Sequence, residues 1–343
     1  PPHMRKDDKW RVLGADSVKD FSATGFFFSK EIYKKHKIPV GVIVSAAGGS
    51  VIRSWISESA LAEIPHAKQT LIEPYKKAIA DYEIEKAKNP KKPPRHPLRS
   101  YSGLFNARVA RLKNLPISGV IWYQGEADAM FAGGHIYREY LEALIKSYRT
   151  HFANDKLPFL VVEIPYYGSH YIWSDLRDSQ RFVANKLDGV HLVSILDLGD
   201  LKDIHPPKKP ELGARLALVA DKVFYGGNGV HTGPIYDSMS VVDNKAILKF
   251  KPESLGGGLV SSDDKALRGF LVAGADKKFT AATAVIEGDS VVVSSPKVKK
   301  PVAVRYGWYP SDGGVNFFNK AGFPCGLFRT DNFRLPTDRT PKK

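Results

Sequence analysis

The stretch VHLVSILDLGDLKDIHP, residues 190–206, joins an apolar run to a polar loop. Its first part, residues 190–196, has the length and the β-branched content of a buried strand. The carboxylates and the histidine that follow would then lie at the carboxyl end of that strand, where open parallel sheets place their active sites. A second junction of this kind is WYQGEAD, residues 122–128, which follows the apolar residues 119–121. Together the two junctions predict a parallel sheet with a polar site at one edge.

Strands and helices are expected to alternate through the first two thirds of the chain. Short apolar runs are separated by stretches whose apolar residues have helical spacing. This alternation predicts an α/β fold, an α/β/α sandwich whose parallel sheet is covered on both faces. The predicted strands are residues 40–45, 119–123, 159–164 and 190–196, and the predicted helices lie within residues 21–33, 137–152 and 212–224.

After about residue 231 the pattern of the sequence changes. Short segments of alternating apolar residues are separated by glycine-rich turns, which is typical of an antiparallel β-sandwich. We therefore expect an α/β domain in residues 1–228 and a C-terminal β-domain in residues 229–343. Examples of the alternating segments are residues 246–250, 269–273 and 290–294.

One segment interrupts the alternation of the first domain. Residues 61–99 begin with a helical pattern, and residues 90–97 then contain four prolines, which break a helix. We interpret this segment as a surface insertion.

Composition and charge exclude several classes of protein. The 343 residues are 43% hydrophobic and 25% charged, as in an ordinary soluble domain, and no apolar run approaches the roughly 20 residues that span a bilayer. Cys325 is the only cysteine, so no intrachain disulfide or thiolate metal cluster is expected. The net charge of +15 gathers in residues 76–99 and in the C-terminal tail, without a recognised nucleic-acid motif. We therefore expect neither a nucleic-acid nor a membrane partner. Because the chain opens with Pro1 rather than methionine, we expect a processed or truncated N-terminus.

His205 is the strongest candidate for a general base. Imidazole titrates near neutral pH, and hydrolysis needs a base of that kind. Asp203, Asp200 and Asp197 are each close enough in sequence to orient the ring through its other nitrogen. Among the other histidines, His231 is the nearest rival, and we assign it to the junction between the two domains.

Two further segments offer groups for binding an oxyanion. The side-chain amide of Gln124 and the N–H of Gly125 follow a predicted strand directly, and both can donate hydrogen bonds. Gly48-Gly49 follows the first predicted strand, and glycines allow close approach of the backbone to a ligand. A paired-carboxylate mechanism using Glu126 and Asp128, as in a glycosidase, is the weaker alternative because both lie on one short loop.

Taken in order, these segments resemble the sialate O-acetylesterase family, a branch of the SGNH (GDSL-like) hydrolases. The resemblance implies an SGNH-type fold and hydrolysis of acetyl esters on sugars, typically 9-O-acetyl groups of sialic acid. It also implies no metal, no organic cofactor, and a secreted or periplasmic location. The matching stretches are residues 21–28, 38–43, 48–49, 119–126, 197–200, 203–206 and 213–216 with Trp55 and Lys209, followed by residues 233–234, 305–308 and 328–331 in the β-domain.

The resemblance also implies a role for each matching side chain. His205 would be the base, and Asp203 would be the acid that orients it. Gly49 or Gly48 would supply an oxyanion N–H, Gln124 a side-chain donor, and Glu126 would belong to the substrate site.

The sequence departs from the family pattern at two positions. Asp128 stands where many members have asparagine. Lys202 stands where the related hydrolases often place the acid of an Asp-x-x-His motif.

The nucleophile is the missing part of the pattern. The family carries its serine in a Gly-Gln-Ser-Asn-Met motif on the first strand, and residues 1–20 contain nothing similar. Ser17 and Ser22 are the serines nearest to that place, and Ser22 also fits a helix N-cap. We therefore expect a carbohydrate O-acetylesterase whose serine lies upstream, so that this chain alone has little or no activity. The alternatives are an acetylxylan esterase of related fold and a non-catalytic glycan-binding protein.

Overall fold

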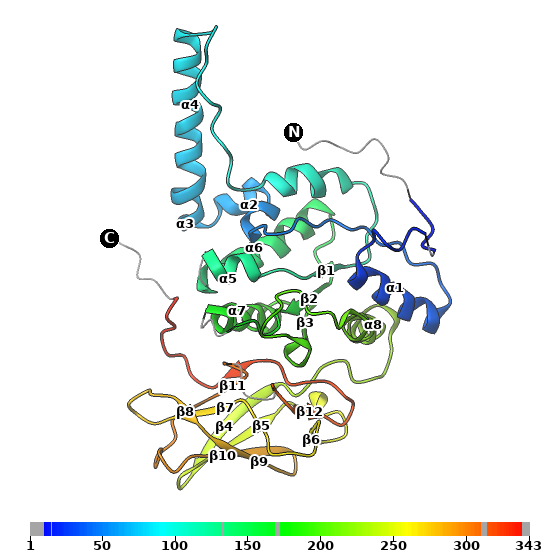
Figure 1. Ribbon diagram of the computed structural model, residues 1–343, viewed down its shortest axis with the longest axis vertical. Coiled ribbons are helices and arrows are strands. Elements are labelled where there is room, and N and C mark those ends of the chain that lie inside the picture. Colours follow the sequence, from blue (N-terminus) through cyan, green and yellow to red (C-terminus); the bar gives the residue numbers. More distant parts are fainter. Residues whose placement is uncertain (1–9, 15, 132–133, 169–171, 310–313, 338–343) are drawn as a thin grey trace.

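The computed structural model describes residues 10–14, 16–131, 134–168, 172–309 and 314–337 (Figure 1). Its first part contains a parallel three-stranded sheet in the order β1-β2-β3. The strands are β1 (Val120–Trp122), β2 (Phe159–Glu163) and β3 (Val190–Ser194). The helices are α1 (Ala23–His36), α2 (Glu58–Ala62), α3 (Pro65–Ala67), α4 (Glu73–Lys88), α5 (Glu126–Phe131), α6 (Gly134–His151), α7 (Ile172–Lys186) and α8 (Lys209–Tyr225), with a 3₁₀ turn η1 at Ile52–Trp55.

Helices cover both faces of this sheet. Successive side chains of a strand point to opposite faces, and β2 is apolar on both. Phe159 and Val161 pack in the cluster formed with α6 and α7, whereas Leu160 and Val162 pack with α1 and α8. The predicted α/β/α sandwich is thereby confirmed.

The helices α1 and α8 lie against each other (Figure 1). Gly213 allows this approach, because a Cβ atom there would lie 2.4 Å from the Cβ atom of Phe27. At the start of α1, the Ser22 hydroxyl accepts a hydrogen bond from the Gly25 N–H and caps the helix.

The prediction of a strand at residues 40–45 was wrong. These residues form neither a helix nor a strand, and Ile43 and Val44 remain 38% and 45% exposed. A strand forms only where a neighbouring strand satisfies its backbone groups, and none of the described strands pairs with this segment.

Within residues 61–99, α4 and the segment after it form a helical arm that projects from the body (Figure 1). Leu61, Ala67 and Ile72 before it are buried in the core, so the expected surface insertion begins at α4 and not at residue 61. No residue of α4 is buried, and the chain returns from Asn89 through the four prolines as an irregular segment without helix or strand. Three pairs of oppositely charged residues along α4 lie within 3.4 Å of each other. Such pairs support an exposed helix by a few tenths of a kcal/mol each.

The C-terminal part is a sandwich of antiparallel sheets, as predicted. One sheet has the order β4-β5-β10-β9, a second has β13-β11-β7-β8, and β12-β6 form a third, smaller sheet. Apolar residues of both larger sheets, such as Leu248 and Val304, form one buried cluster between them. The strands are β4 (Tyr236–Val242), β5 (Lys245–Phe250), β6 (Leu259–Ser261), β7 (Phe270–Ala273), β8 (Thr280–Ala281), β9 (Thr283–Glu287), β10 (Ser290–Ser294), β11 (Ala303–Tyr306), β12 (Phe317–Asn319) and β13 (Phe328–Arg329).

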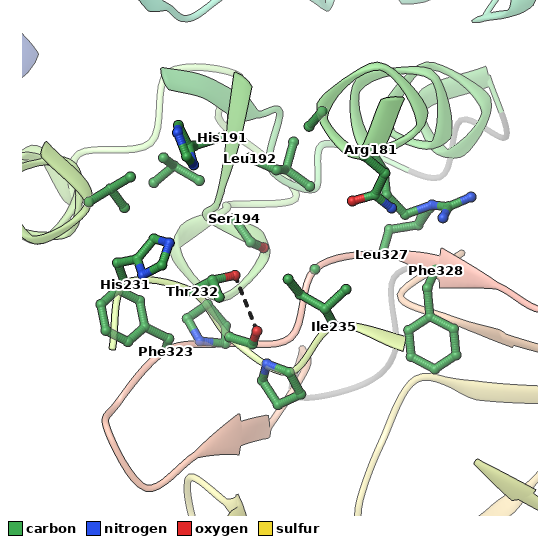
Figure 2. A pocket seen from close by; sticks show the side chains of 18 of the residues that line it. Arg181, His191, Leu192, Ser194, His231, Thr232, Ile235, Phe323, Leu327 and Phe328 are labelled. Atoms are coloured by element: carbon green, nitrogen blue, oxygen red, sulfur yellow. Dashed lines mark hydrogen bonds between the residues drawn. The ribbon is translucent and has the colours of Figure 1, made fainter. Parts of the chain in front are cut away.

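Helix α7 joins the two parts through a buried polar face. Arg329 donates to the Asp178 carboxylate at 3.0 Å, and Thr337 donates its hydroxyl to Asp175 at 2.7 Å. Beside the helix, the Leu327 N–H donates to Glu163 at 2.9 Å. At the outer edge of β3 the two parts also enclose a pocket, which Figure 2 shows from close by.

Candidate active site

Two loops of the candidate site are bound directly to each other. Gln124 follows β1, and its side-chain N–H donates to the Ser50 carbonyl at 3.0 Å. The Ile52 N–H in turn donates to the Asp128 carboxylate at 2.8 Å. The glycine turn at residues 48–49 is therefore held at the carboxyl end of β1.

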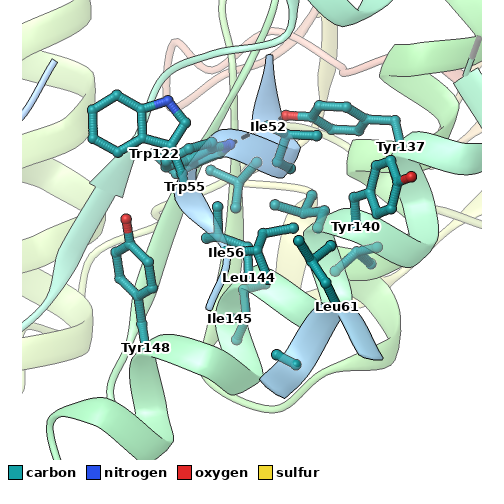
Figure 3. Packing of buried hydrophobic residues seen from close by; sticks show 14 of the residues in the cluster. Ile52, Trp55, Ile56, Leu61, Trp122, Tyr137, Tyr140, Leu144, Ile145 and Tyr148 are labelled. Carbon is teal, nitrogen blue, oxygen red and sulfur yellow. Dashed lines mark hydrogen bonds between the residues drawn. The ribbon is translucent and has the colours of Figure 1, made fainter. Parts of the chain in front are cut away.

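The hydrophobic core holds the residues that follow the glycine turn in place (Figure 3). Ile52 and Trp55, both in the 3₁₀ turn η1, are buried among side chains of α6. The Trp55 ring meets the Trp122 ring edge to face at a centroid distance of 6.2 Å. A rigid core contact of this kind positions a loop more tightly than loop hydrogen bonds alone.

Gly48 and Gly49 face open space. A Cβ atom at either position would find no atom within 4 Å, and Gly49 has a φ angle of +68°, which favours glycine. A ligand can therefore approach the backbone N–H groups of this turn closely, as an oxyanion site requires.

The Gln124 amide is fully engaged within the protein. Besides Ser50, its Nε2 donates to Asp128 at 2.6 Å, and its Oε1 accepts from the Tyr137 hydroxyl at 3.2 Å. An oxyanion would have to replace one of these partners in order to bind the Gln124 N–H. In the observed geometry, Gln124 positions the glycine turn.

Asp128 is a buried clamp between the two loops. Its side chain is 0% exposed, and burial raises its pKa to about 6, although hydrogen bonds from Gln124 and Ile52 act in the opposite direction. A carboxylate sealed from solvent in this way does not reach a substrate. The geometry therefore argues against a paired mechanism that uses Asp128 with Glu126.

Glu126 faces the loop that carries His205. Burial raises the pKa of its carboxyl group, while backbone N–H groups, Lys209 and then His205 lower it. Lys209 places Nζ 5.0 Å from the centre of the Tyr123 ring. Because Tyr123 directly follows β1 and Lys209 follows the loop that carries His205, this contact places the loop after β3 beside the loop after β1.

His205 lies on an exposed loop close to Asp203. Its side chain is 88% exposed, and its Nδ1 is 3.8 Å from the Asp203 carboxylate, which is longer than a hydrogen bond. Asp203 instead accepts a hydrogen bond from the His205 backbone N–H at 2.8 Å. Asp203 thus shapes the loop and is the carboxylate nearest to the ring.

The other two aspartates have different partners. Asp197 forms a paired contact with the Arg215 guanidinium, at 2.9 Å for both hydrogen bonds. Asp200 accepts from the Lys202 backbone N–H at 2.7 Å. Only Asp203 among the three is directed at His205.

The two serines singled out in the sequence are engaged locally. Ser17 bonds to backbone groups of residues 12 and 14, and Ser22 caps α1. Within the described ranges, no serine hydroxyl is hydrogen-bonded to His205. The same part of the chain contains no group of three or more side chains arranged to bind a metal ion.

Two residues of the site, Lys209 and Tyr123, were not among the candidates predicted from the sequence, where Lys209 appears only as a position that matches the family. Both border the site, and burial lowers the pKa of Lys209 while Glu126 and Asp203 raise it. Their place in the sequence could have indicated them, because Tyr123 ends the predicted strand 119–123 and Lys209 is four residues after His205.

Glycine N–H groups and a histidine, presented by loops at the carboxyl edge of a parallel sheet, are two of the parts that an esterase site uses beside its nucleophile. A model of the family described as carbohydrate esterase, sialic acid-specific acetylesterase, matches residues 3–221. The chain belongs to this family, which confirms the resemblance inferred from its motifs.

Individual relatives agree with this assignment. A carbohydrate acetylesterase from Xanthomonas citri has a similar structure, with a TM-score of 0.77 and 33% identity over 93% of this chain and 67% of that one. Sialate O-acetylesterase from Homo sapiens is 26% identical over 257 residues, covering 69% of this chain and 46% of the relative. The Mus musculus enzyme of that name is 26% identical over 270 residues, covering 69% and 49%. The chain thus spans about half the length of these mammalian relatives.

Proposed function

We propose that the protein is a carbohydrate O-acetylesterase that removes acetyl groups from sugars, with 9-O-acetyl groups of sialic acid as the first candidate substrate. The observation that carries the proposal is the meeting of three loops, residues 48–52, 124–128 and 203–209, at one edge of the sheet. Membership of the esterase family and likeness to a bacterial carbohydrate acetylesterase support the same activity.

In the proposed reaction a serine hydroxyl attacks the acetyl carbonyl carbon, and His205 accepts the serine proton. The N–H of Gly49 stabilises the developing oxyanion, in a turn that Gln124 holds in place. The C–O bond to the sugar then breaks, and His205 returns the proton to the sugar oxygen. Water attacks the acetyl-serine in the second half of the reaction and releases acetate. Asp203 stabilises the charged imidazole, and Glu126 lies beside the substrate path.

We propose that the nucleophilic serine comes from a segment other than residues 1–343. Ser17 and Ser22 both hold local backbone structure, and neither contacts His205. A base and an oxyanion site without a nucleophile retain only residual catalysis.

The test compares this chain with one extended by its upstream coding sequence. Both are assayed for acetate release from 9-O-acetyl-N-acetylneuraminic acid and from acetylated xylan, and both are treated with a fluorophosphonate that labels reactive serines. We expect labelling and turnover only in the extended chain, with the sialic acid ester preferred. Preference for acetylated xylan would favour the acetylxylan esterase. Absence of turnover in both chains, with sugar binding retained, would favour a glycan-binding protein. Full activity of the short chain would refute the external nucleophile.

We also propose a secreted or periplasmic location, supported by family membership. In a fractionated culture that expresses the complete coding sequence, the protein should separate with the extracytoplasmic fraction. Recovery in the cytoplasmic fraction alone would contradict this location. Among the described residues, no helix has the length and apolar character needed to cross a membrane.

A further inference from the structure

The pocket between the two parts is separate in its lining from the ester-hydrolysis loops. It has a volume of about 160 Å³ and is bounded by β3, α7 and α8 on one side and by residues 231–236 and 323–328 on the other. None of the residues assigned to ester hydrolysis lines it. Because β3 is the edge strand of its sheet, this side of the strand faces the pocket instead of another strand.

Uncharged polar groups gather on one side of the pocket (Figure 2). The His191 ring on β3 meets the His231 ring edge to face, at a centroid distance of 6.1 Å. Burial lowers the pKa of both imidazoles, and the charge of His231 lowers that of His191 further. The lowered pKa values favour neutral rings at neutral pH. His191 then offers one donor and one acceptor, whereas His231 donates its N–H to the Gly229 backbone and offers an acceptor.

Two hydroxyl groups also belong to the polar lining, together with Asn185 and Tyr236. Ser194 is 8% exposed, and its Oγ makes no hydrogen bond of normal geometry, although it lies near enough to Glu163 to lower the pKa of that carboxyl. Thr232 donates its hydroxyl to the Gly233 carbonyl at 3.2 Å. Both oxygens retain lone pairs for a ligand donor, and a buried hydroxyl without a normal partner is uncommon in native structures.

The charged residues of the lining are two arginines, and each binds an aspartate outside the pocket. The Arg181 guanidinium binds Asp178 at 2.6 Å, and Arg215 is paired with Asp197. No carboxylate lines the pocket among the described residues. An anionic ligand would have to compete with Asp178 and Asp197 for these guanidinium groups, and a cationic ligand would find no carboxylate among the described lining residues.

The opposite side of the pocket is apolar. Leu192, Ile235 and Leu327 lie across from the two imidazole rings, and the Phe323 ring lies beside His231 (Figure 2). Neutral hydrogen-bonding groups on one side and apolar surface on the other match a ring that carries hydroxyl groups around its edge and C–H groups on its face. A water needs roughly 10–15 Å³ of such volume, so the pocket of about 160 Å³ has room for about 11–16 atoms of water size.

We propose that this pocket is an accessory binding site for an uncharged sugar ring, of the chemistry of a neutral pyranoside. His191, His231, Ser194 and Thr232 bind its hydroxyl groups, and the apolar side contacts its C–H face. Binding at this site does not require ester hydrolysis, so the binding experiment tests this proposal independently of the proposed catalytic activity.

The test uses the full chain and three probes at neutral pH: methyl galactoside, methyl xyloside and N-acetylneuraminic acid as an anionic sugar. Binding is measured by saturation-transfer NMR and by calorimetric titration. Ser194→Ala removes one hydroxyl with little change in volume. His231→Phe removes two polar atoms and fills space. Ser102→Ala is the matched control, because Ser102 is also buried with an unpartnered Oγ but lies outside the pocket.

We expect at least one neutral glycoside to bind with millimolar affinity. Ser194→Ala should weaken binding about fivefold, the factor that corresponds to one neutral hydrogen bond of about 1 kcal/mol. His231→Phe should weaken it at least about tenfold, whereas Ser102→Ala should leave it unchanged. Circular dichroism verifies that each variant is folded. If His231→Phe is unfolded, the comparison of Ser194→Ala with the wild type tests the proposal. Binding of N-acetylneuraminic acid alone, equal binding by all variants, or no binding of either neutral glycoside would overturn the proposal.

Discussion

Replacing Asp128 by asparagine should change how the stability of the protein depends on pH. The Asp128 carboxylate accepts hydrogen bonds from Ile52 and Gln124 through a single oxygen, and its other oxygen has no partner. The carbonyl oxygen of an asparagine can accept the same two bonds without carrying a charge into the interior. The substitution therefore isolates the cost of burying that charge.

The magnitude follows from the pKa of the buried group. Burial raises the pKa of Asp128 from 3.8 to about 6. Between these values the folded protein keeps its proton while the unfolded chain has lost it, so the free energy of unfolding falls as pH rises. A shift of roughly two units at about 1.4 kcal/mol per unit amounts to about 3 kcal/mol, present below pH 3.8 and lost above pH 6. The asparagine of the Asp128→Asn variant would not titrate, and the cost of its unpaired amide, about 1–3 kcal/mol, would be the same at every pH.

The assay is urea unfolding of both proteins, followed by circular dichroism at pH 4 and at pH 7. All other titrating groups are shared, so the difference between the two proteins reports Asp128 alone. We expect the variant to gain about 2.4 kcal/mol in free energy of unfolding relative to the wild type from pH 4 to pH 7, because at pH 4 the unfolded chain is already partly ionised. Asp81→Asn, on the exposed face of α4, is the control and should show almost no such gain. A stability difference that stays constant within about 1 kcal/mol from pH 4 to pH 7 would refute the reasoning.

Three further substitutions test other parts of the structure. Asp178→Ala removes a buried carboxylate that binds three arginines, and should lower the free energy of unfolding by about 3–5 kcal/mol in urea titrations; a loss below about 1 kcal/mol would contradict its structural role. Gly213→Ala forces a Cβ atom against Phe27 and should cost about 1–3 kcal/mol by the same measurement, whereas Gly14→Ala, which meets open space, should cost almost nothing. His205→Ala in the complete enzyme should reduce kcat for acetyl esters about a thousandfold or more, with an unchanged Tm because the side chain is 88% exposed; retention of kcat would remove His205 from the mechanism.

Local sequence patterns predicted most of the fold. The apolar runs at β2 and β3 and the helical spacing of α6 and α8 depend on burial alone, which the sequence shows directly. The pattern failed at residues 40–45, because an apolar, β-branched run becomes a strand only when a neighbour pairs with it. It also gave no signal for α7, whose buried face includes Asp175 and Asp178. A helix that buries charge has no simple amphipathic pattern.

The candidate site could be predicted only as a set of positions. Gly49, Gln124 and His205 were found because each follows a predicted strand or an apolar run. Their partners depend on contacts between distant segments, which spacing does not encode. The pairing of Asp197 with Arg215 and the engagement of the Gln124 amide are of this kind.

The buried polar face of α7 also constrains how this protein can evolve. A recombination event that exchanged the C-terminal strands for those of a distant relative would separate Asp178 from Arg329 and Asp175 from Thr337. Each hydrogen bond to a buried carboxylate lost in this way would cost about 1.5–3 kcal/mol, a large part of the stability of an ordinary domain. The two parts should therefore be inherited together, and viable chimaeras should be those whose crossover lies within a surface element such as the helical arm.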